Sequence, residues 1–158
     1  MNEENVLSVT SQAFREGQAI PLRNSARGEN ISPDISLHNL SPDAKAIAIL
    51  MDDMSHPIFN VYNHWIIWNL PVQSEISEGI PHGKRLPNGA IQGIGYGRHH
   101  YKGPKPPRGT THTYRFTVYI LNAVLKLPAG TRKKRLLAAM EGHILQSASL
   151  SGTFHSGK

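Results

Sequence analysis

Three segments of the chain have the two-residue period of a β-strand, with apolar residues on one face or on both, and this pattern restricts the fold more than any other feature. The segments are residues 45–53, 62–70 and 112–121. Successive side chains of a β-strand point to opposite faces, and in the first two segments apolar residues occupy both faces. Strands of this kind are covered above and below. The pattern therefore predicts the central strands of a sheet.

Four polar side chains stand at the ends of these strands. Asp53 ends a face of the first strand, His64 lies near the start of a face of the second, and His112 with Tyr114 opens a face of the third. The apolar residues expected to share these faces are Ile47, Ile49 and Met51, then Ile66 and Trp68, then Phe116, Val118 and Ile120. Taken alone, His64 is more simply a core histidine bonded to a backbone carbonyl. Together the four residues suggest one small pocket, although spacing alone leaves open whether they meet.

The composition suits a compact, mainly β protein. The 158 residues are 39% hydrophobic and 18% charged, which favours a single globular domain over residues 1–158. Fourteen glycines and eleven prolines indicate many turns. The chain has no cysteine, so disulfides and thiolate metal sites are excluded. Its acidic N-terminus resembles no signal peptide and no apolar run is long enough to span a bilayer, so we expect a soluble, cytoplasmic protein.

Two long irregular segments and one late helix complete the prediction. Residues 21–43 and 93–111 are rich in turn-forming residues, and structured loops of this length are usually functional. A helix is expected from Thr131, as N-cap, through Met140, with Gly142 as its break. Basic residues fill the first turn of this helix and oppose its dipole.

Charge and motifs leave two alternatives open. The net charge of +6 favours an acidic partner, but only residues 131–135 concentrate basic side chains, so no nucleic-acid partner is expected. A nucleic-acid or membrane-surface protein acting through residues 132–135 remains one alternative. No nucleophile elbow, phosphate-binding loop or dinucleotide loop is present. A hydrolase or metalloenzyme using Asp53, His64 and His112 as general base or ligands is the other alternative.

Several ordered motifs resemble one family over nearly the whole chain. They are NISPDISL (30–37), DDMSHP (52–57), YNHWIIWNLP (62–71), GPKPPRGTTHTYRFTVYIL (103–121) and GHILQSASLSGTF (142–154). This set is similar to the phosphatidylethanolamine-binding protein family, also called the Raf kinase inhibitor-like family. The size of the chain resembles the short bacterial and archaeal branch.

The resemblance implies a fold and a site. The fold is an antiparallel β-sandwich-like single domain with one or two short helices near the C-terminus. The implied ligand-binding residues are Asp53, Pro57, His64, Gly103, Pro106, Pro107, His112 and Tyr114, and Gly109 matches the same loop. The implied ligand is a phosphate-like anion or phospholipid head group, bound without cofactor, metal or catalysis. His64 is then a pocket residue, with imidazole and phenol donors facing the anion.

Departures from the family pattern leave the ligand and partners open. Ser55 replaces the second Asp of the family's Asp-x-Asp-x-Pro motif and Met54 its usual Pro. Tyr62 and Thr113 also differ from relatives. The natural ligand, a kinase or protease partner, a homodimer and the isomer of the His56–Pro57 bond all remain open.

Overall fold

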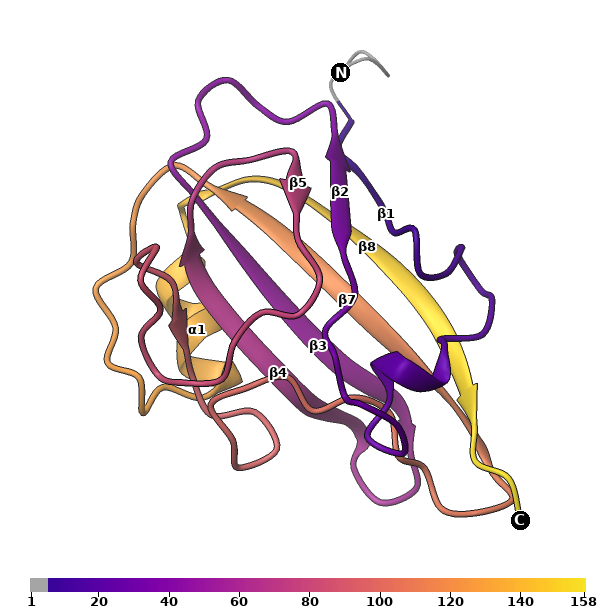
Figure 1. The fold of residues 1–158 in the computed structure, drawn as a ribbon. Coiled ribbons are helices and arrows are strands. Elements are labelled where there is room, and N and C mark those ends of the chain that lie inside the picture. The colour runs from indigo at the N-terminus through magenta and orange to yellow at the C-terminus, as the bar shows by residue number, and fades with distance from the viewer. Residues whose placement is uncertain (1–5) are drawn as a thin grey trace.

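Two antiparallel sheets form the protein, and the three strands predicted from the sequence lie in the larger sheet. The computed structural model describes residues 6–158, so residues 1–5 of the predicted domain and of the acidic N-terminus lie outside the described range. The larger sheet has the order β6-β4-β3-β7-β8, and the smaller one the order β1-β2-β5 (Figure 1). The larger sheet comprises Ile91–Gln92, Asn60–Leu70, Ala46–His56, Thr111–Leu121 and Ile144–His155 in that order. The smaller comprises Ser8–Thr10, Ile35–His38 and Glu75–Ile76.

The core has two parts because the larger sheet is covered on both faces. One cluster joins side chains of both sheets, including Val9 and Leu37 from the smaller sheet and Phe116 from the larger. The other lies on the opposite face, under α1 (Lys133–Met140), which contributes Leu136 and Met140. Figure 1 shows the smaller sheet on one side of the larger sheet and α1 on the other. The predicted mainly β, antiparallel sandwich is confirmed.

The three apolar segments are confirmed as the central strands. β3 lies between β4 and β7, and its residues 46–53 are all buried. Apolar residues on both faces suit β3 because the larger sheet is covered on both sides. β7 buries the predicted face from His112 to Ile120 and leaves Arg115 exposed on the other face.

Three details differ from the sequence-based expectations. α1 begins after Arg132 as N-cap rather than Thr131, whose hydroxyl is buried and has no hydrogen-bond partner in the described part of the chain. Gly142, with φ of +80°, follows the end of α1 as expected. A turn of 3-10 helix, Leu22–Asn24, lies in the first segment expected to be irregular. β8 was not predicted, and neither were the short strands β1, β2, β5 and β6.

Two further points concern the His56–Pro57 bond and membrane-spanning helices. The described residues contain no cis peptide bond, so His56–Pro57 is trans. Within residues 6–158, no helix combines the length and apolar character that crossing a bilayer requires.

Candidate functional site

Asp53, His112 and Tyr114 come together because β3 and β7 are paired in register. Asp53 lies opposite Tyr114 in β7 and opposite Tyr62 in β4. Asp53 is 4% exposed, His112 is 8% exposed and Tyr114 is fully buried. These side chains therefore gather at the end of β3 that leads into the β3–β4 hairpin.

His64 reaches the same place through a β-bulge. Met51 pairs with Trp65 but Asp52 pairs with Asn63, so His64 is the extra residue of β4. A bulge of this kind re-aims the side chains of its strand. The centroid of the His64 ring lies 5.4 Å from that of Tyr114. The expectation that His64 shares a face with Ile66 and Trp68 is wrong, because those two residues belong to the core under α1.

His112 is held by the carboxylate of Asp53. The His112 Nδ1 and Asp53 Oδ2 atoms are 2.7 Å apart, and the second Asp53 oxygen accepts the Ser55 N–H at 2.8 Å. A carboxylate of this kind accepts hydrogen bonds, so His112 carries its proton on Nδ1. The Nε2 atom of His112 is thereby left for a ligand.

His64 is oriented in the same way by the backbone. Its Nδ1 atom lies 2.8 Å from the carbonyl oxygen of Lys102, which can only accept, so Nδ1 donates. The sequence-based alternative of a histidine bonded to a carbonyl thus describes one of its two nitrogens. Burial lowers the pKa of His64, and the Lys102 carbonyl and the charge of Asp53 oppose this shift only in part. The ring is neutral at pH 7, with Nε2 as its remaining polar atom.

Tyr114 and the cations nearby complete the electrostatics. Burial, and secondarily the negative charge of Asp53, raises the pKa of Tyr114, so its phenol keeps the proton as a donor. Burial also lowers the pKa of Lys102, and the charges of Lys105, Arg98 and Arg27 add to this effect. The cluster therefore combines a neutral phenol donor with several positive charges nearby.

Comparison with known proteins gives the family. Residues 10–155 match the family model described as phosphatidylethanolamine-binding protein. The chain belongs to the phosphatidylethanolamine-binding protein family. It is 40% identical over 153 residues to a UPF0098 protein of Methanothermobacter thermautotrophicus, covering 96% of this chain and all of that relative.

Two solved structures of phosphatidylethanolamine-binding protein relatives have the same fold. A homolog from Chlamydia trachomatis is 35% identical and superposes with a TM-score of 0.84, covering 96% of this chain and 99% of that one. YbcL of Escherichia coli, described as a member of the mammalian family, has a TM-score of 0.83 over 94% of this chain and 98% of its own. It is 20% identical, so this likeness shows the fold alone. The resemblance inferred from the sequence motifs is confirmed.

The loop after Tyr101 forms a wall beside the cluster, since its Lys102 carbonyl contacts His64. Gly103 donates its N–H to Asn30 Oδ1 at 2.7 Å, and a Cβ at Gly103 would lie 2.4 Å from the carbonyl oxygen of Asn24. Arg27 donates to the Pro106 carbonyl at 2.9 Å. Glycine is needed at position 103 because the two loops approach so closely.

The expected wall residues do not all lie in the buried part of this loop. Gly103 and Pro106 are buried, whereas Pro107 and Gly109 are exposed in the turn before β7. Pro57 is exposed in the turn of the β3–β4 hairpin. The structure thus buries Gly103 and Pro106 in the loop whose Lys102 carbonyl contacts His64, and leaves the other three at the surface.

Sequence reasoning missed the residues that hold this wall in place. Asn30 connects to Gly103 and also donates to the carbonyl of Tyr101 at 2.9 Å. Arg27 donates its Nε–H to Ser156 Oγ at 2.6 Å, which ties the wall to the C-terminal segment. These contacts join residues far apart in the sequence, so no local pattern could reveal them.

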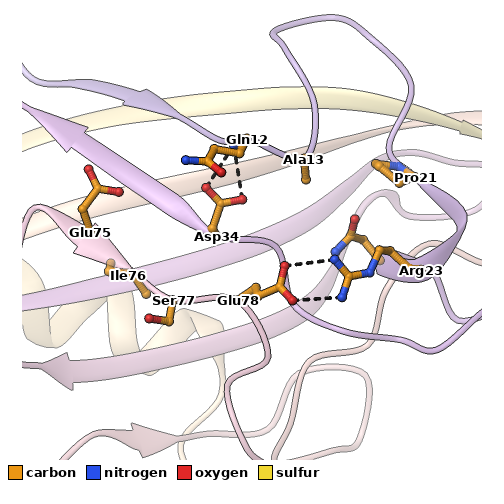
Figure 2. Close-up of a pocket in the computed structure, with 10 residues that line it drawn as sticks. Gln12, Ala13, Pro21, Arg23, Asp34, Glu75, Ile76, Ser77 and Glu78 are labelled. Atoms are coloured by element: carbon orange, nitrogen blue, oxygen red, sulfur yellow. Dashed lines mark hydrogen bonds and ion pairs between the residues drawn. The ribbon is translucent and has the colours of Figure 1, made fainter.

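A separate cavity of about 500 Å³ lies by β5 and the 3-10 helix, among the residues in Figure 2. Its three carboxylates are already engaged. Glu78 pairs with Arg23 at 2.9 Å, Glu75 accepts from Ser36 at 2.6 Å, and Asp34 accepts from the backbone of Gln12 at 2.9 Å. Over residues 6–158, no group of three or more His, Asp or Glu side chains is arranged to hold a metal ion. Neither observation favours the hydrolase or metalloenzyme alternative.

Proposed function

We propose that this protein is a binding module for a phosphate-like anion, such as a phospholipid head group. The proposed ligand-binding residues are Asp53, His64, His112 and Tyr114. The observation that carries this proposal is the orientation of the two histidines. Each is fixed through Nδ1, by Lys102 or by Asp53, and each ring packs beside Tyr114.

The chemistry of these groups suits an anion with several oxygens. The Tyr114 phenol donates one hydrogen bond, and each imidazole donates through Nε2 when the ring is protonated. A neutral His64 instead offers a lone pair, which accepts the hydroxyl proton of a phosphate monoanion. Hydrogen bonds between charged partners are about twice as strong as neutral ones. The negative charge of Asp53 compensates a His112 cation and is also suited to receive an ammonium group of a ligand.

The proposed wall excludes water from one side of the anion. Gly103 and Pro106 form it, and Pro57, Pro107 and Gly109 line the rim outside. A dry wall strengthens hydrogen bonds to the ligand because the local dielectric is low. A kinase or protease partner, a homodimer and a cytoplasmic location remain predictions that are independent of this pocket.

The test is an NMR titration of imidazole resonances. Sulfate is the first probe because it does not titrate near neutral pH, and phosphoethanolamine is the second. We expect saturable shifts of His64 and His112, and loss of the His64 shift in His112→Ala. His38, which contacts Thr10 at 2.9 Å in the smaller sheet, is the internal reference.

A matched variant separates pocket loss from unfolding. His38→Ala should retain the sulfate response of His64 and His112, and the backbone amide spectrum of each variant reports its fold. If His112→Ala unfolds, His112→Asn serves in its place. Shifts confined to residues 132–135, with both imidazoles unmoved, would refute the proposed function.

A further inference from the structure

The turn between β3 and β4 displays apolar side chains to solvent. Ile58 is 77% exposed and Phe59 is 61% exposed. The turn is held in this conformation because His56 Nδ1 accepts the N–H groups of both residues, each at 3.2 Å. Asn60, with φ of +63°, then starts β4. The exposure is thus a property of an ordered turn.

A groove joins this turn to the start of α1. It has a volume of about 450 Å³, and its apolar lining includes Phe59, Val61 and Leu137. Lys133 and Lys134 also line it. A smaller hollow of about 230 Å³ shares both lysines and adds Arg132. An apolar surface and a basic rim are therefore continuous.

The basic rim is not explained by the stability of α1. Arg132, Lys134 and Arg135 are exposed. Within residues 6–158, Lys133 is the one cation of this rim that forms an ion pair, at 3.0 Å from Asp52. The first turn of α1, all of it within the described range, contains no acidic residue. Cations at a helix N-terminus oppose the helix dipole. An external anionic surface would compensate this excess of positive charge.

A chain of aromatic contacts connects the turn to the candidate pocket. Ring centroids are 5.7 Å apart between Phe59 and Tyr62, 5.3 Å between Tyr62 and Tyr96, and 4.8 Å between Tyr96 and His64. The Lys102 ammonium lies 5.1 Å from the centre of the Tyr96 ring. The aromatic contacts thus run from the turn to the pocket, and Tyr62 and Tyr96 also line the smaller hollow beside the basic rim.

We propose that the β3–β4 turn and the first turn of α1 form a docking surface for an anionic lipid bilayer. Apolar side chains beside exposed cations match an interface in which acyl chains lie beneath anionic head groups. A second copy of the chain is the weaker candidate, because it would bring the same cations together. Docking would deliver the pocket to lipid head groups. This benefit rests on the proposed function, whereas the docking itself is independent of it.

The test is co-sedimentation with vesicles of phosphatidylcholine alone or with about one third phosphatidylglycerol. Binding should require phosphatidylglycerol and weaken as salt rises. Phe59→Ser should reduce the partition coefficient about tenfold or more, since a buried aromatic side chain is lost from the bilayer. Lys134→Gln should reduce it about fivefold, the contribution of one basic residue near an anionic surface.

Matched controls lie at the other end of the same hairpin. Val72→Ser and Lys45→Gln change exposed residues beyond the far ends of β4 and β3. Because β3 and β4 each span 11 residues, both controls lie roughly 30 Å from the β3–β4 turn. Both controls should bind vesicles like the unchanged protein.

The outcomes separate the two proposals. Three results would overturn the docking surface. They are absence of binding to vesicles, an equal loss of vesicle binding in the two controls, and a dimer in light scattering that dissociates in Phe59→Ser. Binding to an acidic protein that competes with vesicles and is stronger than vesicle binding would overturn it as well. If sulfate leaves His64 and His112 unmoved while vesicle binding follows Phe59 and Lys134, the pocket fails and the docking surface stands.

Discussion

Gly103→Ala tests how closely the wall loop must pack. A Cβ there would lie 2.4 Å from the Asn24 carbonyl oxygen, whereas ordinary contact begins at 3.4 Å. The two loops would have to separate by the difference, about 1 Å, because the obstacle is backbone. That shift would break the 2.7 Å bond from Gly103 N–H to Asn30 Oδ1, since such bonds extend to only about 3.2 Å.

The expected loss of unfolding free energy follows from these two effects. Overpacking costs about 1–3 kcal/mol, and the lost hydrogen bond about 1 kcal/mol. We therefore expect a loss of about 2–4 kcal/mol, a large share of the roughly 5–15 kcal/mol that holds a typical domain folded. In urea denaturation the midpoint should fall while the slope m stays unchanged.

Gly157→Ala is the control for this experiment. A Cβ at Gly157 meets no atom within 4 Å among the described residues, so its effect should be within about 0.5 kcal/mol. The Lys102 carbonyl, next to Gly103, orients His64, so the sulfate response of His64 should also weaken in Gly103→Ala. Equal stabilities of the two alanine variants would refute the reasoning, since the loops would then yield at no cost.

Three further predictions follow from single contacts. Burial lowers the pKa of His64 below 6.5, and bound sulfate favours the imidazolium, so sulfate should raise the pKa of His64. The affinity for sulfate should therefore increase as the pH falls through this pKa. An NMR pH titration with and without sulfate checks both predictions, and an unchanged pKa would contradict them. Thr131→Val replaces a buried hydroxyl that has no hydrogen-bond partner among the described residues, so urea denaturation should show a free energy of unfolding about 1 kcal/mol higher. A lower free energy of unfolding would show that this hydroxyl is not an unsatisfied group. Arg27→Met keeps the stem but removes the bonds to Ser156 and Pro106, so it should cost about 1–3 kcal/mol and speed proteolysis of the wall loop, whereas unchanged cleavage would show that these bonds do not hold the loop.

Much of the larger sheet could be predicted from local pattern. Residues 45–53 indicate a central strand because they are apolar on both faces, and residues 112–121 indicate a strand because apolar residues alternate along them. β8 escaped prediction since it is an edge strand whose first residues, from Ile144, are mostly exposed. Its serine-rich sequence has little intrinsic strand preference, and pairing with β7 along its length decides its conformation.

Local patterns in the sequence were enough to predict the three central strands, the family resemblance and Asp53, His64, His112 and Tyr114 as candidates. How these four residues meet depends on the folded chain. The bulge that turns His64 toward Tyr114 depends on the register between β3 and β4, and a shift of one residue changes the face of every side chain. The wall depends likewise on Arg27 and Asn30, which reach it across the fold. Contacts between distant segments leave no periodic trace in a sequence, so only their geometry in the folded chain reveals them.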